Sequence, residues 1–212
     1  MQNFESVHLI ENPLITHKLS IMRMKTTPGK DFRSLLEEIA MLMTYEVAKT
    51  FQSREVEIET PIKSCRVNVL DEENFVIVPI LRAGLGMSAG VLKMLPGASV
   101  GHIGLYRDEK TFQPVEYYSK MPPNLSEKFL LVTDPMLATG GSCAAALQML
   151  KEKGAKKIVL MTLLAAPKGL ETVAKAHPDV PIYTASIDDG LNEKAYIVPG
   201  LGDAGDRIFG TL

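Results

Sequence analysis

From residue 56 onward, short apolar segments alternate with amphipathic ones. The strongly apolar segments are residues 75–81, 98–106, 128–134, 157–166 and 182–188. Nearly continuous apolar runs of this length are typical of strands that are buried on both faces of a sheet. Segments with helical patterning lie between several of them, at about 86–95, 141–153 and 168–176. This alternation predicts an α/β fold with a doubly wound, mostly parallel sheet flanked by helices.

The first 55 residues have a different, helical pattern. Asn12 followed by Pro13 is typical of a helix start, and the helix is expected to reach about Met24. A second helix is predicted after Pro28 because its apolar residues recur at three- and four-residue steps. Those residues are Phe32, Leu35, Leu36, Ile39, Met43 and Val47. Two short strands, VEIET and CRVNVL, are expected to follow at 56–60 and 65–70.

Composition narrows the class of protein without identifying it. The 212 residues are 46% hydrophobic and 23% charged, with a formal net charge of −2, which fits one large domain spanning 1–212. That charge argues against a broad nucleic-acid-binding surface. The only two cysteines, Cys65 and Cys143, form no metal-binding pattern. No signal peptide and no membrane-length apolar run stand out, so we expect a cytoplasmic protein without a membrane partner.

Three predicted strands end in a polar residue, and ligands of doubly wound sheets bind beyond such carboxyl ends. Arg82 follows the strand at 75–81, Arg107 follows the strand at 98–106, and Asp134 closes the strand at 128–134. Arginine beside the backbone amides of Ala83-Gly84 suits an anion. The alternative is an arginine that merely leaves a buried strand for solvent.

Glycine spacing after Arg82 also matches a different kind of site. Gly84-x-Gly86-x-x-Ala89 fits the dinucleotide fingerprint, and Asp108 stands where that fingerprint expects its ribose-binding acid. A nicotinamide-dependent enzyme is therefore an alternative interpretation. Against it, Arg82 separates the strand from the glycines. A second match, GLGDAG at 200–205, leaves too few residues for a helix and a further strand.

The segment VTDPMLATGGSC at 132–143 is the most informative loop. Thr139-Gly140-Gly141-Ser142 supplies hydroxyls and unhindered amides at a predicted helix start, where N–H groups lack intrahelical partners and attract anions. The motif is not the common nucleotide P-loop. Asp134, five residues ahead of Thr139, can accept hydrogen bonds from sugar hydroxyls. A ribose 5-phosphate would satisfy both parts, whereas an ordinary tight turn would need neither.

At this point the chain resembles a known family. VTDPMLATGGS is similar to the phosphoribosyl diphosphate (PRPP) motif of type I phosphoribosyltransferases. PILRAGLGM, LYRDE, YTASIDDGLNE and YIVPGLGDAGDRIFGT together resemble the uracil-specific branch of that family, over nearly the whole chain. Pro135 departs from the wider superfamily, where many members carry a second acidic residue, but it agrees with the uracil branch.

The resemblance implies a reaction and a set of roles. Uracil and PRPP would give UMP and diphosphate in pyrimidine salvage, with Mg²⁺ carried mainly by PRPP. Arg82 and Arg107 would bind the diphosphate, Asp134 the ribose, and Asp203 would lie between base and PRPP. The remaining PRPP-binding residues would be Pro135, Met136, Leu137, Ala138, Thr139, Gly140, Gly141 and Ser142, with 138–142 cradling the 5′-phosphate. Uracil would be read by Ile197, Gly202 and Ala204 through backbone groups. Asp203, directly or through water, is the weak candidate for the base that removes the N1 proton.

Further expectations concern the outer parts of the chain. Residues 108–120 are predicted to form a flap over PRPP, and 185–212 a uracil-binding tail. The resemblance also implies a homodimer or larger homo-oligomer, with GTP as a candidate effector for which the sequence shows no separate motif. An RNA-binding regulator on the same fold is a further alternative. It would need an extended basic face, whereas the lysines are scattered apart from a short cluster at 151–157.

Overall fold

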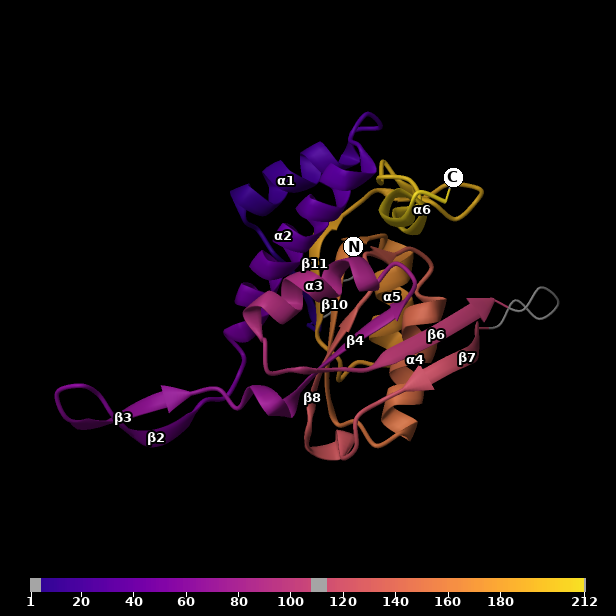
Figure 1. Ribbon diagram of the computed structural model, residues 1–212. Helices are drawn as coiled ribbons and strands as arrows, with labels where there is room; N and C mark the ends of the chain where they lie inside the picture. The colour runs from indigo at the N-terminus through magenta and orange to yellow at the C-terminus, as the bar shows by residue number, and fades with distance from the viewer. Residues whose placement is uncertain (1–4, 108–113, 212) are drawn as a thin grey trace.

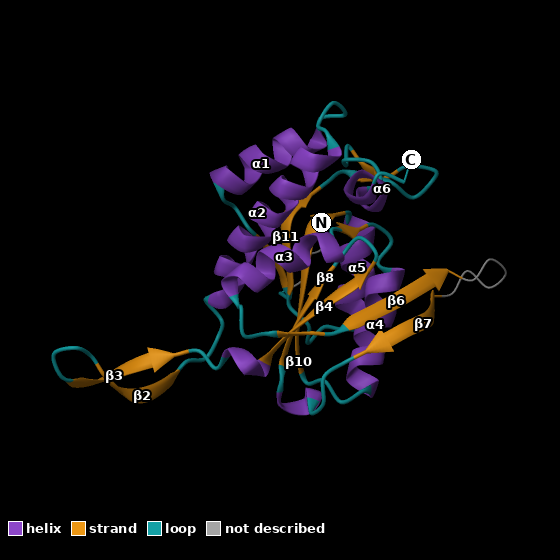
Figure 2. Ribbon diagram, viewed as in Figure 1, coloured by secondary structure: helices purple, strands orange, loops and turns teal. Residues whose placement is uncertain are grey.

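The computed structural model describes residues 5–107 and 114–211, which form a central sheet between two layers of helices (Figures 1 and 2). The helices are α1 Pro13–Arg23, α2 Gly29–Ala48, α3 Leu85–Met94, α4 Gly141–Glu152, α5 Pro167–Ala176 and α6 Ala204–Phe209. The main strands are β1 Val7–Leu9, β4 Phe75–Leu81, β6 His102–Arg107, β7 Pro114–Lys120, β8 Phe129–Thr133, β10 Lys157–Ala165 and β11 Ile182–Ile187. Shorter strands are β2 Arg54–Glu59, β3 Ser64–Val69, β5 Ser99–Val100, β9 Met136–Leu137, β12 Gly190–Leu191 and β13 Ile197–Val198.

The order of the strands shows where the sheet reverses its winding direction. The main path runs β1-β11-β10-β8-β4-β6-β7, and its pairs are parallel except for antiparallel β6 and β7. The chain continues from β4 to β6 on one side, whereas β8, β10 and β11 extend the sheet on the other side. The winding direction therefore reverses between β4 and β8. In open α/β sheets the ligand crevice lies at such a reversal, beyond the carboxyl ends of the strands.

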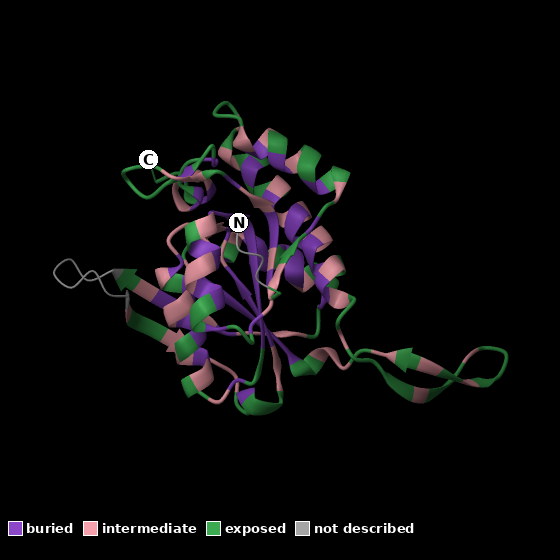
Figure 3. Ribbon diagram, turned by 180° about the vertical axis from the view of Figure 1, so that it is seen from behind, coloured by how far each residue is buried: buried purple, intermediate pink, exposed green. Residues whose placement is uncertain are grey.

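Each face of the sheet has its own hydrophobic core. Helices α1, α2 and α3 cover one face, where Phe32, Ile39 and Met87 are fully buried among residues of β4, β8 and β10. Helices α4 and α5 cover the other face through Leu147, Leu150 and Val173. Figure 3 shows the buried residues concentrated in the sheet and on the inner sides of these helices. The predicted doubly wound, mostly parallel sheet is therefore confirmed.

The sequence-based boundaries of the long elements are also confirmed. Asn12 caps α1 by accepting from the Leu14 N–H at 2.9 Å and the Ile15 N–H at 3.4 Å, and Pro13 is the first helical residue. The apolar stripe of α2 is buried, except that Leu35 is half-buried. Strands β2 and β3 pair antiparallel as an arm that stands away from the sheet (Figure 1).

Two elements were not predicted. The six-residue α6 begins within GLGDAG at Ala204, and no further strand follows it among the described residues, in agreement with the expectation that too few residues remain for a helix and a further strand. Strand β1, which was not predicted, adds to the edge of the sheet beside β11. Of the expected flap, β7 pairs antiparallel with β6, and residues 108–113 lie outside the described residues. Among the described helices, none is long and apolar enough to span a membrane.

At the reversal point, the absence of a side chain at Gly84 lets the loop after β4 pack directly against the end of β8. A Cβ atom there would lie 2.3 Å from the Thr133 carbonyl oxygen and 2.7 Å from both the N and O of Ile80. All three contacts are to backbone, so no side-chain rotation can relieve them.

We therefore expect Gly84→Ala to lower the free energy of unfolding by about 3 kcal/mol or more, because β4 and β8 must separate. Urea denaturation would measure this. The matched control is Gly190→Ala, since a Cβ there meets nothing within 4 Å. It should change stability by less than about 0.5 kcal/mol. Equal effects of the two substitutions would contradict the packing argument.

Candidate active site

The carboxyl ends of β4 and β8 bring two of the predicted site segments together. Val78 pairs with Val132 and Pro79 with Thr133, so the chain leaves both strands at the same level. The loop after β4 begins with Arg82, and the loop after β8 begins with Asp134. The Thr133 hydroxyl donates to the Gly84 carbonyl at 3.1 Å, which joins the two loops directly. The Leu81–Arg82 peptide bond at the start of the first loop is cis.

Asp134 lies in a poorly solvated position. Desolvation raises the pKa of its carboxyl group to about 6, although two donors act in the opposite direction. The Met136 N–H donates to Oδ1 at 3.3 Å, and the Cys143 thiol donates to Oδ2 at 3.5 Å. Burial and the nearby carboxylate in turn raise the pKa of the Cys143 thiol. Asp134 is therefore a strong acceptor held with few partners of its own.

The loop that follows Asp134 leads to an uncapped helix start. Gly140 is the N-cap of α4 with φ +85°, and no side chain bonds to the first turn. A Cβ at Gly140 would lie 2.7 Å from the Gly169 carbonyl oxygen, so glycine is required there for space as well as for φ. The first-turn N–H groups of α4 have no intrahelical acceptors and therefore suit a phosphate.

A hollow of about 110 Å³ marks this loop. It is lined by Asp134, Met136, Leu137, Ala138, Thr139, Gly140, Ser142 and Cys143. Of the predicted PRPP residues of this loop, only Pro135 and Gly141 do not line the hollow. Those that surround it together with Asp134 are Met136, Leu137, Ala138, Thr139, Gly140 and Ser142. Pro135 and Leu137 are buried, and their carbonyl oxygens accept from the Leu164 and Ala166 N–H groups of β10 and its end. Those two residues anchor the loop to the sheet.

The C-terminal tail forms the opposite wall of the site. Asp203 caps α6 by accepting from the Asp206 N–H at 2.9 Å, and Gly202 has φ +83°. Arg207 fixes this tail to the end of α1 and the turn that follows it, since it donates to the carbonyl oxygens of Met22 at 2.6 Å and Met24 at 2.8 Å. Its guanidinium also lies 4.4 Å from the centre of the Phe32 ring.

A second pocket, of about 290 Å³, lies between the tail and the strand-end loops. Its lining comprises Ala83, Met136, Ala138, Lys194, Ala195, Tyr196, Ile197, Gly202, Asp203, Ala204 and Gly205. It contains all four residues predicted to face the base, and it shares Met136 and Ala138 with the hollow beside Asp134. The two spaces are therefore neighbours, separated by the loop that follows β8.

The structure describes the side chain of Arg82 but only the backbone of Arg107. Arg82 is exposed, with its guanidinium 3.9 Å from the Asp206 carboxylate and 5.4 Å from the centre of the Phe209 ring. It therefore lies between the β4 loop and α6. Arg107 is the last residue of β6, and its side chain lies outside the described part of the structure.

Comparison with known proteins decides the family. A family model described as uracil phosphoribosyltransferase matches residues 9–211. The chain belongs to the uracil phosphoribosyltransferase family. It is 61% identical over 202 residues to a uracil phosphoribosyltransferase of Clostridium tetani, covering 95% of this chain and 97% of that one. A uracil phosphoribosyltransferase of a Thermoanaerobacter species is 56% identical over 208 residues, covering 98% and 99%.

Solved structures share the fold of this chain. The AQ2163 protein of Aquifex aeolicus superposes with a TM-score of 0.92 at 38% identity, covering 97% of this chain and 98% of that one. Adenine phosphoribosyltransferase of Trypanosoma brucei shares the fold, with a TM-score of 0.61 at 12% identity over 96% and 90% of the two chains. As a member of the uracil phosphoribosyltransferase family, the protein is a glycosyltransferase that transfers a pentosyl group. The nicotinamide-enzyme and RNA-regulator alternatives are thereby set aside.

Several residues of the site were not found from the sequence. Cys143 reads as a small helix residue, yet its thiol contacts Asp134. Residues 194–196 line the larger pocket because Asn192 folds them into a tight turn, with its Oδ1 accepting from the Lys194 and Tyr196 N–H groups at 3.0 Å each. The sequence signal for that turn is Asn192, since the side chain of asparagine commonly bonds to the backbone two residues ahead.

The raised pKa of Asp134 predicts a cost in stability. Its folded-state pKa of about 6 lies above the ordinary value of 3.8, so the fold favours the neutral form. Stability should therefore fall as pH rises from about 4 to 6 and then remain reduced. Asp134→Asn mimics the neutral carboxyl group. We expect it to raise the free energy of unfolding at pH 8 by about 1–3 kcal/mol, with little difference at pH 4.

Urea denaturation of both proteins across this pH range would measure the difference. Asp179→Asn is the control, because hydrogen bonding by Lys151 lowers the pKa of that aspartate. Its substitution should not stabilise the protein at pH 8. A pH-independent difference between Asp134→Asn and the parent would contradict the desolvation argument.

Proposed function

We propose that this enzyme transfers the 5-phosphoribosyl group of PRPP to N1 of uracil, releasing UMP and diphosphate, in pyrimidine salvage. The observation that supports this most directly is the pair of adjoining spaces. One combines an acceptor carboxylate with an uncapped helix start, and the other is walled by backbone of the tail. A ribose phosphate fits the first and a small planar base fits the second, with C1′ of the sugar at the boundary.

In this proposal, the phosphate loop and Asp134 fix the sugar. The 5′-phosphate accepts from the amides at 139–142, whose positive helix end favours an anion. The ionised Asp134 accepts from ribose hydroxyl groups. Because its carboxylate is poorly solvated before binding, these donors replace partners that it lacks. Holding the sugar in one orientation presents C1′ to the base.

Charge development governs the chemical step. The C1′–oxygen bond to diphosphate breaks while the bond from C1′ to uracil N1 forms, so positive charge gathers on the sugar and negative charge on the leaving group. Arg82 and Arg107 stabilise that negative charge. The N1 proton leaves through Asp203 or water that it holds, since Asp203 lines the base pocket.

Mg²⁺ fits this arrangement as a companion of PRPP. Within the described residues no group of three or more His, Cys, Asp or Glu side chains is placed to hold a metal ion. Asp134 still offers one carboxylate beside the sugar, and Mg²⁺ commonly combines one carboxylate with substrate phosphates and water. Bound in this way, the ion would neutralise charge on the diphosphate. Asp134 and Arg82 would then orient the substrate around it.

The family relationship supports further parts of the proposal. We place the enzyme in the cytoplasm as a homodimer or larger homo-oligomer, with GTP as a candidate effector. The hairpin of β6 and β7 would cover PRPP and exclude water from the reacting sugar.

The choice between uracil and other bases is the most direct test of the proposed function. We expect uracil and PRPP to give UMP, whereas cytosine should be used less well by a factor on the order of a thousand. Cytosine lacks the N3 hydrogen and carries an amino group in place of the O4 acceptor, so two buried groups remain unpaired. Chromatographic detection of UMP and CMP would measure both rates. Comparable use of cytosine, hypoxanthine or orotate would contradict the uracil assignment.

A second prediction concerns the leaving group. Arg82→Ala should lower kcat/KM for PRPP by roughly two orders of magnitude, because a charge-assisted contact that strengthens in the transition state is lost. Arg82→Lys should recover only part of this, since the planar fork of donors is absent. The control is Arg54→Ala, which alters an exposed arginine of the projecting arm that is paired with Asp71. Near-normal turnover by Arg82→Ala would remove Arg82 from the mechanism.

A further inference from the structure

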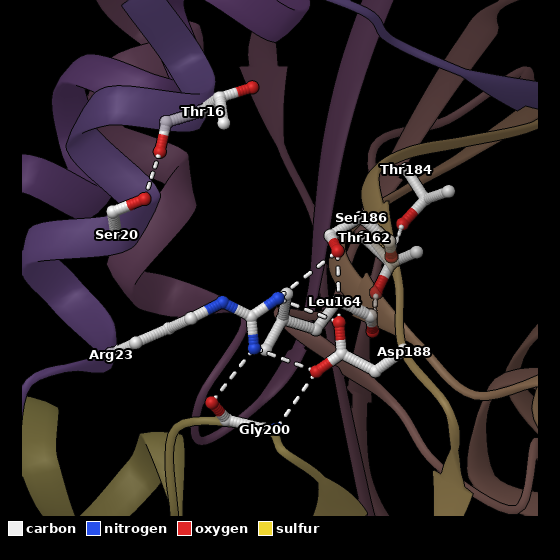
Figure 4. Close-up of polar contacts among 9 residues, drawn as sticks. All are labelled: Thr16, Ser20, Arg23, Thr162, Leu164, Thr184, Ser186, Asp188 and Gly200. Atoms are coloured by element: carbon white, nitrogen blue, oxygen red, sulfur yellow. Dashed lines mark hydrogen bonds and ion pairs between the residues drawn. The ribbon is translucent and has the colours of Figure 1, made fainter.

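A partly buried ion pair holds the tail from outside the base pocket, which neither of its residues lines. Arg23, the last residue of α1, reaches Asp188, which follows β11 (Figure 4). Its two terminal nitrogens donate to the two carboxylate oxygens at 2.7 and 2.6 Å. The Asp188 side chain is only 3% exposed. This fork-to-fork geometry fixes direction as well as distance.

The same two residues bind both backbone groups of Gly200. The Gly200 N–H donates to Asp188 Oδ2 at 2.8 Å, and the Gly200 carbonyl oxygen accepts from Arg23 at 2.9 Å. Gly200 has φ +61°, and a Cβ there would lie 2.1 Å from the Ile197 carbonyl oxygen. The turn is therefore held at one residue by a rigid pair of charged groups.

Further hydrogen bonds hold the ion pair of Arg23 and Asp188 in place. The Ser186 hydroxyl donates to Asp188 Oδ1 at 2.9 Å and accepts from Arg23 at 3.1 Å. The Asp188 N–H donates to the Ala165 carbonyl oxygen at the end of β10 at 2.9 Å. Burial alone would raise the pKa of Asp188, but the hydrogen bonds from Arg23, Gly200 and Ser186 hold it below its ordinary value. The carboxylate is thus charged and fully engaged.

The residues that follow Gly200 are those proposed to read the base. Gly202 and Ala204 line the base pocket, as does Ile197 just before the turn. In the part of the chain that the structure describes, no hydrogen bond occupies the N–H of Gly202 or of Ala204. Their positions therefore depend on the fixed points on either side. These are Gly200 before them and Arg207 of α6 after them, which donates to the carbonyl oxygens of Met22 and Met24.

We propose that Arg23 and Asp188 are positioning residues for base recognition: by clamping Gly200, they place the backbone amides of Gly202 and Ala204 at the uracil edge. This inference rests on the proposed function. It assigns α1, whose residues do not line the base pocket, a role in uracil affinity. The clamp bonds to no residue that lines the hollow beside Asp134, so PRPP affinity should depend on it much less than uracil affinity does.

The test separates uracil affinity from PRPP affinity. Arg23→Lys keeps the charge but loses the fork, so it should lower kcat/KM for uracil by about ten- to a hundredfold, mainly through KM. The dissociation constant of PRPP, measured by calorimetry without uracil, should change by less than about threefold. Asp188→Asn, which alters the other end of the pair, should show the same split.

Lys18→Met is the matched control. Lys18 lies on the same helix and pairs with Glu38 of α2 at 2.5 Å, with no contact to the tail. It should leave both affinities unchanged. Hydrogen exchange at residues 198–204 should accelerate in Arg23→Lys and not in Lys18→Met, because only the first variant loosens the turn.

Two results would overturn the inference. One is an equal loss of uracil and PRPP affinity in Arg23→Lys. The other is an unchanged KM for uracil in a variant that has merely become less stable, since the pair would then be only an anchor. If the parent protein formed no UMP, the proposed function would fail instead, and hydrogen exchange at 198–204 would still show whether the clamp holds the turn.

Discussion

The close approach of the Gly84 loop to the end of β8 determines where the rest of the active site lies. There is no room for a side-chain carbon at Gly84, and the Thr133 hydroxyl joins the two loops at 3.1 Å. Because the winding reverses between these two strands, no helix separates the loops above them. Arg82 and Asp134 can therefore face one ligand from adjacent strand ends. The tail then only has to cover a crevice that already exists.

The site gives up local stability at the positions that would bind ligand. Helix α1 begins with a capping asparagine whose side chain satisfies two amides, whereas α4 begins at Gly140 with no side-chain cap. A capping side chain typically contributes about 0.5–2 kcal/mol, and α4 lacks that contribution. Asp134 adds a second cost, since it is ionised in a poorly solvated position. The two cores on either side of the sheet offset these costs, and under the proposed function phosphate and sugar hydroxyls would supply the partners that both groups lack.

Much of this arrangement follows from the sequence, because it depends on local patterns. Apolar runs of seven to ten residues marked the buried strands, and Asn12-Pro13 marked the start of α1. The strand ends at Arg82 and Asp134 were predictable because parallel strands expose their carboxyl ends at one edge. Strand β1 was missed because three residues with only partial burial carry no clear periodicity. Helix α6 was missed because six residues are too few for a helical stripe. Its position depends on the contacts of its own Arg207 with Met22, Met24 and Phe32, which are far away in the chain.

The tail shows why the remaining contacts could not be predicted. A site that reads a base through backbone groups places few demands on the side chains of the reading residues themselves. The demands shift to glycines that permit the turn and to distant arginines that hold it. Arg23, Arg33 and Arg207 all donate to main-chain carbonyl oxygens of the tail, at Gly200, Ile208 and Leu201. In the sequence, the first two are ordinary charged residues of amphipathic helices. Their role in holding the tail is visible only when α1 and α2 are seen to lie beside residues 200–208, because the groups that accept from them are main-chain oxygens of that segment.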